Sequence, residues 1–254
     1  MIPSQQATGS DGSSAVRRVK AREVIALPGT FCSPLIFERL PPLLDEHIEM
    51  HALSWMTDAP SHRIEEVAEW VAGSIGHAGQ EPVLLVGHST GGAIALQLAL
   101  TRPDLVGALM LINTGPNMRH HGDVTSLIDS MRRDGTADVV RAVMDRSFHR
   151  VPPAEVRERL LEYGHAVPVQ AALDALSSQH ATDFAPRLAQ LRMPVSVVHG
   201  RFDAVRTVAD AEAMTAAVPG ARLSVLDAGH SPMYEAPEQV AEALGDLLER
   251  HKVT

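Results

Sequence analysis

The sequence predicts an α/β protein, in which a mostly parallel sheet is flanked by helices and carries an inserted helical cap. Three observations indicate this. Short apolar runs alternate with helix-periodic stretches along most of the chain. One apolar run leads directly into a Gly-x-Ser-x-Gly turn. Between residues 116 and 190, by contrast, helical patterns follow one another without a convincing strand.

Composition places the chain among ordinary globular proteins and narrows its partners. Net charge is −9 over 254 residues, and the charges are spread rather than clustered. A nucleic-acid partner would require a basic face, and no apolar run is long enough for a membrane helix. A single cysteine, Cys32, suits a reducing compartment. We therefore expect a cytoplasmic protein, monomeric or homo-oligomeric, that acts on a small-molecule substrate without nucleic-acid or membrane partners.

The predicted strands and core helices are taken in chain order. Residues 1–21 are polar and lack the basic and apolar regions of a secretory signal, so they are predicted to be a disordered tail. Strands are predicted at 23–27, 48–53, 83–86, 108–112, 194–198 and 222–226. A short helix over 35–44 is interrupted by two prolines, and Ser61 is the expected N-cap of a helix that ends near Gly79. Later helices are predicted at 208–217 and from Pro237 onward.

The insertion carries four predicted helices, at 123–133, 137–148, 154–163 and 169–179, separated by glycine or proline. We interpret residues 116–190 as a lid over a site, with residues 22–115 and 191–254 forming the core. Apolar stripes on these helices are equally compatible with a simple extension of the core.

The stretch Val83 to Ala99, VLLVGHSTGGAIALQLA, is the most informative in the chain. An apolar strand, a tight glycine turn and a helix follow one another, which is the arrangement of a nucleophile elbow that exposes Ser89. Gly87 and Gly91 are expected where any β-carbon would clash, and Gly92 where the helix packs close to the strand. The alternative is a glycine-rich turn with a passive serine.

A serine nucleophile needs a base, and the base needs a group that orients it. In a parallel sheet such groups gather at the carboxyl ends of the strands. His230 is the expected base, because it follows a strand in a glycine-containing loop, and Asp203 is its expected partner. Asp227 is the rival carboxylate, but it lies only three residues from His230. His88 adjoins the serine at a turn where neighbouring side chains diverge.

An oxyanion that develops during the reaction needs fixed N–H donors. The amide of Thr90 directly after the nucleophile is one, and Thr30 in the Pro28-Gly29 loop is the other. Cys32 is expected to be a small packing residue. No histidine pair shows metal-ligand spacing, and the adjacent His120 and His121 do not converge easily on one ion. We therefore predict no metal and no cofactor.

With these residues identified, the chain resembles the α/β-hydrolase superfamily from about Arg22 onward. The resemblance is carried by VGHSTGGAIALQLA at 86–99, HGRFDAV at 199–205 and AGHSPMYEAPEQVAEAL at 228–244, in the order Ser, Asp, His. It is greatest to the enol-lactonase, carboxylesterase and carbon–carbon-bond hydrolase group with a helical cap. Two departures are Pro28-Gly29, where the family usually has His-Gly, and the apparent lack of the first two family strands.

The resulting hypothesis is a serine esterase or lactonase that cleaves a small, largely apolar substrate through an acyl-enzyme on Ser89. Alternatives are hydrolysis of a carbon–carbon bond in a vinylogous diketone, a ligand receptor on a hydrolase fold, and a cofactor-free oxygenase or perhydrolase. Hydrolysis of a carbon–carbon bond would be favoured by an arginine or asparagine in the pocket placed for a carboxylate, with Arg119, Arg201 and Arg206 as candidates. Expected substrate contacts are Phe31, His88, Met118, Met144, Phe148, Phe202 and Met233.

Overall fold

Six strands form one parallel sheet in the computed structural model, which describes residues 22–76 and 81–253. Every pairing between neighbouring strands is parallel. The strands, in their order across the sheet, are β2 (Ile48–Ala52), β1 (Arg22–Leu27), β3 (Val83–His88), β4 (Val106–Ile112), β5 (Val195–Gly200) and β6 (Arg222–Leu226). The predicted fold class is confirmed. The predicted disordered tail, 1–21, lies outside the described residues.

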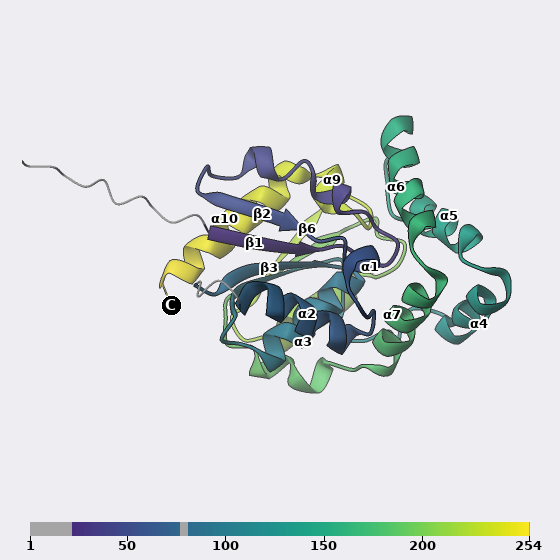
Figure 1. Ribbon diagram of the computed structural model, residues 1–254. Coiled ribbons are helices and arrows are strands. Elements are labelled where there is room, and N and C mark those ends of the chain that lie inside the picture. The colour runs from purple at the N-terminus through teal and green to yellow at the C-terminus, as the bar shows by residue number, and fades with distance from the viewer. Residues whose placement is uncertain (1–21, 77–80, 254) are drawn as a thin grey trace, which may run out of the picture.

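Helices cover both faces of this sheet (Figure 1). The face that carries Leu85 packs against α2 (Ile64–Gly76), α3 (Thr90–Thr101) and α8 (Val208–Ala217). The opposite face, with Leu84 and Val86, packs against α10 (Pro237–Val253). All six residues of β3 are buried, which explains why this strand is apolar on both sides rather than alternating.

Several short elements have no signal in the sequence. These are the four-residue helices α1 (Trp55–Asp58) and α9 (Pro232–Glu235) and the 3₁₀ turn η3 (Ala185–Gln190). The expected helix over 35–44 is instead two 3₁₀ turns, η1 (Pro34–Phe37) and η2 (Pro41–Leu43). Elements this short bury too few residues to show a period.

The predicted N-cap of α2 also differs. Ser61 donates to Glu66, and the amide of Ile64 donates to Ser178 Oγ at 3.0 Å. A partner 114 residues away in the chain therefore satisfies this helix end, and no local pattern encodes it. The predicted end near Gly79 lies outside the described residues, and α2 is described as far as Gly76.

The inserted segment contains α4 (Val124–Asp134), α5 (Ala137–Arg146), α6 (Ala154–Ala166) and α7 (Val169–Ala181). Figure 1 shows these helices beyond the carboxyl ends of the strands, where β1, β3 and the other strands point. α4 packs on α7 and α5 on α6, while α7 also contacts α1, α2 and α3. Buried cap residues such as Met131 and Ala172 belong to the same apolar cluster as the sheet. The insertion thus covers the strand ends and is continuous with the core through α7.

The chain reverses its direction across the sheet between β1 and β3. From β1 it runs outward to β2, and from β3 onward it runs the other way through β4, β5 and β6. The loops that follow β1 and β3 therefore run in opposite directions and leave a crevice between them. Open α/β sheets bind ligands in such a crevice. The Pro28-Gly29-Thr30 loop follows β1 and Ser89 follows β3, so both border this crevice.

The nucleophile elbow is sterically tight. Ser89 has φ 52° and ψ −118°, a conformation that is strained for any residue with a side chain. A β-carbon on Gly91 would lie 2.0 Å from the carbonyl oxygen of Leu27, and one on Gly87 would lie 2.6 Å from the carbonyl oxygen of Gly91. Both glycines are therefore required by the close approach of backbone to backbone.

Gly91→Ala is expected to lower the free energy of unfolding by about 3 kcal/mol or more, because the new methyl group collides with backbone atoms that cannot move aside. The matched control is Gly245→Ala in α10, where a β-carbon meets nothing within 4 Å. This change should be neutral or add up to about 1 kcal/mol, since alanine is the better helix former. Urea denaturation measures both values. Equal stability of the two variants would contradict the steric account.

Candidate active site

His230 and Asp203 form a buried pair at the carboxyl ends of β6 and β5. The Nδ1 of His230 lies 2.9 Å from Oδ2 of Asp203, and the two side chains are 7% and 0% exposed. Burial raises the pKa of the Asp203 carboxyl, but the charge of His230 and the hydrogen bonds from His230 and Val205 outweigh it and hold the pKa below its usual range. Asp203 is therefore a carboxylate that orients the imidazole.

Asn113 holds this carboxylate in place. It follows β4 with φ 45°, and its Nδ2 donates to Asp203 Oδ2 at 2.7 Å and to the carbonyl of Gly229 at 3.3 Å. Its Oδ1 accepts from the amide of Gly200 at 3.1 Å. From the sequence, Asn113 is recognised only as a polar residue at a strand end. Because it has no carboxylate, it is excluded as the acid of the triad. Its supporting role becomes visible once the neighbouring loops are in place.

The rival carboxylate, Asp227, is not near the imidazole. Its side chain is 70% exposed and forms an ion pair with Arg201. A residue three positions before His230 leaves the strand in another direction, so the spacing argument against Asp227 agrees with the structure.

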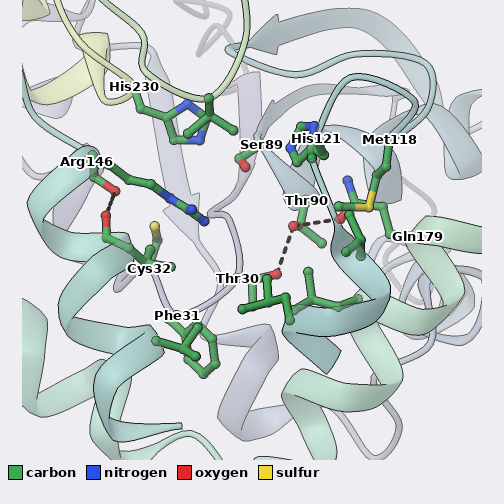
Figure 2. A pocket seen from close by; sticks show the side chains of 18 of the residues that line it. Thr30, Phe31, Cys32, Ser89, Thr90, Met118, His121, Arg146, Gln179 and His230 are labelled. Atoms are coloured by element: carbon green, nitrogen blue, oxygen red, sulfur yellow. Dashed lines mark hydrogen bonds between the residues drawn. The ribbon is translucent and has the colours of Figure 1, made fainter. Parts of the chain in front are cut away.

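Ser89 lies beside His230 in the wall of one cavity (Figure 2). Its amide donates to Ile112 O at 3.0 Å, and its carbonyl accepts from Thr114 Oγ1 at 2.7 Å. These bonds hold the strained turn against β4. Ser89 Oγ and His230 share no direct hydrogen bond here, and such catalytic bonds often tighten only when substrate is bound.

Thr30, in the loop after β1, and Thr90, the first residue of α3, approach each other. Their hydroxyl oxygens are 2.8 Å apart, and Thr90 Oγ1 donates to Oε1 of Gln179 at 2.9 Å, so Thr30 is the donor to Thr90. Figure 2 shows this row of hydrogen bonds along one side of the cavity. Neither backbone amide, of Thr30 or Thr90, has a hydrogen-bond partner among the described residues. Two residues that line the cavity thus have backbone N–H groups without a protein acceptor.

His88 lies underneath the site rather than in it. Its side chain is fully buried, its Nδ1 accepts from the Gly29 amide at 3.3 Å, and its Nε2 lies 2.9 Å from the carbonyl oxygen of His230. Burial lowers the pKa of His88 to about 3, so the ring is neutral and Nε2–H is the donor. The Gly29 amide is thereby occupied, and the next amide in the loop is that of Thr30.

Other contacts fix the same loops. Trp55, fully buried, donates from Nε1 to the carbonyl of Pro28 at 2.8 Å. Glu235 accepts from the Gly229 amide and from the Arg150 amide, each at 2.8 Å. The loop of His230 is thus tied to the segment that follows α5, and the cap and the catalytic loop share an anchor.

The cavity has a volume of about 300 Å³, which suits a small molecule. Its apolar lining comes largely from the cap, with Met118, Val124, Leu127, Val139, Val143 and Leu176. Of the expected substrate contacts, Phe31 and Met118 line it. Phe31 lies in the loop after β1, and Met118 lies in the segment between β4 and α4.

The other expected substrate contacts lie elsewhere. Met144 and Met233 belong to the apolar cluster that also contains the buried face of α10. His88 is buried in the elbow. Phe148 packs edge-on against Tyr234. Phe202 is 47% exposed and stacks on His149. Apolar character alone did not distinguish side chains that face the cavity from those that face the core.

Five polar lining residues are not among those that the sequence indicates for the site: His120, His121, Arg146, Ser147 and Gln179. The arginines that the sequence suggested are engaged elsewhere. Arg119 pairs with Asp183, Arg201 pairs with an aspartate at the surface, and Arg206 donates to the carbonyl of Asn117. Arg146 and Gln179 lie on helices that cover the strand ends. This position is the sequence feature that could have indicated them as cavity residues.

Cys32 also lines the cavity. Burial raises the pKa of its thiol to about 12. A thiol that stays protonated is a poor nucleophile, so this residue does not compete with Ser89. No group of three His, Cys, Asp or Glu residues able to hold a metal ion occurs in 22–76 and 81–253.

Two histidines, the buried His88 and the partly buried His121, make stability depend on pH. Burial lowers the pKa of both His88 and His121 to about 3, whereas the unfolded chain takes up those protons near pH 6.5. A depressed histidine pKa therefore gives stability that is present above pH 6.5 and is lost progressively toward pH 3. Each such group should remove about 1 kcal/mol of unfolding free energy between pH 7.5 and 5.5.

Urea denaturation at those two pH values tests this dependence. His121→Gln is expected to lose about 1 kcal/mol less than the wild type over the interval, because it lacks one titrating group. The control is His165→Gln on the exposed face of α6, which should retain the wild-type loss. If His121→Gln matches the control, the desolvation of His121 is not the cause.

Comparison with known proteins identifies the family of this chain. The profile of the Alpha/beta hydrolase family matches residues 24–243. The chain belongs to this family. It is 30% identical, over 86% of its length and 90% of the relative's, to a pimeloyl-[acyl-carrier protein] methyl ester esterase of Xanthomonas campestris pv. campestris. A protein of the same description from Aromatoleum aromaticum is 29% identical over 66% of this chain and 74% of its own.

Solved structures show the same fold. The enol-lactonase from Burkholderia xenovorans LB400 superimposes with a TM-score of 0.81 at 20% identity, covering 92% of this chain and 93% of its own. A thermophilic esterase from Thermogutta terrifontis gives 0.78 at 21% identity, with 91% of each chain covered. Within the described residues, no helix is long and apolar enough to cross a membrane.

Proposed function

We propose that this protein is a serine hydrolase that cleaves a small carboxylic ester or lactone through an acyl-enzyme on Ser89. The single observation that carries the proposal is the buried pair of His230 and Asp203, 2.9 Å apart, in the same cavity wall as a serine held in a strained turn. A serine, an oriented imidazole and unpartnered amides in one cavity are what acyl transfer requires.

The proposed sequence begins with attack of Ser89 Oγ on the substrate carbonyl, while Nε2 of His230 accepts the hydroxyl proton. Asp203 stabilises the imidazolium, and the Thr30 and Thr90 amides bind the oxyanion. Collapse of the tetrahedral intermediate breaks the bond to the leaving oxygen, which takes the proton from His230. Water, activated by the same imidazole, then releases the carboxylic acid and restores Ser89.

The relatives support an ester as the bond that is cleaved, and the cavity volume supports a substrate with a short acyl group. A volume of about 300 Å³ with a largely apolar cap wall accommodates a few carbons rather than a long chain. The relatives at 29–30% identity are methyl ester esterases by description. The structural neighbours, an esterase and an enol-lactonase, support the fold only.

Turnover of 4-nitrophenyl esters from acetate to octanoate, combined with fluorophosphonate labelling and intact-mass analysis, tests the proposal. We expect one label on Ser89, a rate maximum at a short acyl chain, and loss of both in Ser89→Ala. A wild-type protein that is not labelled would refute the nucleophile. Labelling without turnover of any ester or lactone would instead favour a carbon–carbon bond substrate or a receptor role.

A further inference from the structure

Arg146 brings a positive charge into the cavity from the end of α5. It lines the cavity together with Ser89 and His230. Figure 2 shows its side chain extending from the cap helix between His230 and Cys32 toward the side of the cavity that holds Ser89. The guanidinium is therefore placed to contact the molecule that is bound for reaction, not merely the solvent around the cap.

This guanidinium lacks a protein partner. Within the described part of the chain it forms neither an ion pair nor a hydrogen bond. Neighbouring cap arginines do pair with aspartates: Arg141 with Asp138, and Arg157 with Asp145. Asp145, which is adjacent to Arg146 in the sequence, is thus paired with Arg157 and not with Arg146. Burial lowers the pKa of Arg146, but an arginine remains charged at neutral pH.

The side chains that line the cavity supply no counter-charge. Aspartate and glutamate outnumber lysine and arginine by 31 to 22 in this chain, yet none of the residues that line the cavity is acidic. The nearby carboxylate that does interact electrostatically with Arg146 is Asp203, whose oxygens are taken by His230, Asn113 and Val205. Arg146 as a whole residue is exposed, so its guanidinium is hydrated and open to a ligand of opposite sign that enters the cavity.

We propose that Arg146 binds a carboxylate of the substrate, so that the preferred ester carries a second, free carboxylate a short apolar chain away from the reacting carbonyl. The planar guanidinium suits a bidentate carboxylate, and the cap valines Val139 and Val143 contact the chain between the two groups. This inference rests on the proposed ester hydrolysis and specifies its substrate class. An arginine in this place also meets the criterion given above for a carbon–carbon bond substrate, and turnover of the methyl esters below distinguishes the two. Arg146 is then a specificity residue and not a part of the triad.

Matched methyl esters test the proposal on the acyl side. Monomethyl glutarate and monomethyl adipate are compared with methyl pentanoate and methyl hexanoate, in which a methyl group replaces the free carboxylate, and acid release is followed in a pH-stat. A second pair, 4-acetoxybenzoate and 4-acetoxybenzamide, places the carboxylate on the alcohol side. We expect the anionic member of at least one pair to have a kcat/KM tenfold or more above its neutral counterpart.

Arg146→Gln is expected to reduce this anionic-to-neutral ratio by at least tenfold, and Arg146→Lys to retain part of it, because an ammonium keeps the charge but not the fork. The control is Arg141→Gln, an exposed arginine on the same helix, which should keep the wild-type ratio. A ratio that Arg146→Gln leaves within threefold of the wild type, or neutral esters that match the anionic ones in the wild type, would overturn the proposal.

A binding measurement separates this inference from the proposed function. Glutarate and adipate are titrated by calorimetry into Ser89→Ala, with and without Arg146→Gln. Binding that the second substitution weakens tenfold or more would support the carboxylate site even if no ester were turned over. No binding of either dicarboxylate to Ser89→Ala, combined with turnover of neutral esters alone, would overturn the site and leave the hydrolase intact.

Discussion

Ser89→Ala and His230→Ala are each expected to lower the kcat for ester hydrolysis by about 10⁴-fold or more. The double variant should lose little beyond either single change, because nucleophile and base act as one unit and removing one disables the other. Residual activity over water should survive in all three, since the Thr30 and Thr90 amides remain and still bind an oxyanion.

The test is kcat and kcat/KM for a short 4-nitrophenyl ester, with circular dichroism to show that each variant is folded. Losses that multiply in the double variant would mean that Ser89 and His230 act independently. A single variant that retains more than a tenth of the wild-type kcat would remove that residue from the chemistry.

Asp203→Asn is expected to lower kcat by about 10³- to 10⁴-fold with a smaller change in KM. The amide cannot stabilise the imidazolium, and it favours the wrong imidazole tautomer because its NH₂ donates where the carboxylate accepted. The acceptor for Nδ1 of His230 and for the Val205 amide is then lost or turned around. Because a buried polar network is disturbed, a fall in stability of about 1–3 kcal/mol should accompany the loss.

Asp227→Asn is the matched control for Asp203→Asn, as it makes the same chemical change in the other candidate. Asp227 is exposed and pairs only with Arg201 among the described residues, so kcat should stay within about twofold of the wild type and stability within about 0.5 kcal/mol. If the control loses activity and Asp203→Asn does not, the acid of the triad is misassigned.

The sequence predicts the elements with strong periods well. The four cap helices begin and end within three residues of their expected positions, because each buries an apolar stripe over ten residues or more. Parallel strands that are buried on both faces stand out as apolar runs, and β3 is the clearest. Elements of three or four residues, such as α1 and η2, are stabilised by tertiary contacts and leave no local period.

Part of the candidate site follows from topology and part does not. Strand ends meet at one edge of a parallel sheet, so Ser89, Asp203 and His230 are found by listing polar residues there. The cavity wall depends instead on which way each cap side chain turns. Met144 and Arg146 are two residues apart on α5, yet Met144 is buried in the core cluster while Arg146 lines the cavity. The spacing of apolar residues along a helix does not show which neighbouring side chains face the cavity and which face the core.

The buried imidazole of His88 has a consequence for exchanging parts between members of the family. It accepts one hydrogen bond from the Gly29 amide and donates one to the carbonyl of His230, so one neutral ring connects the loop after β1 with the loop of His230. Both partners are main-chain groups, so a loop grafted from a relative keeps its bond to His88 only if its backbone follows the same path. A chimera should therefore tolerate sequence changes in either loop more readily than a change in loop length.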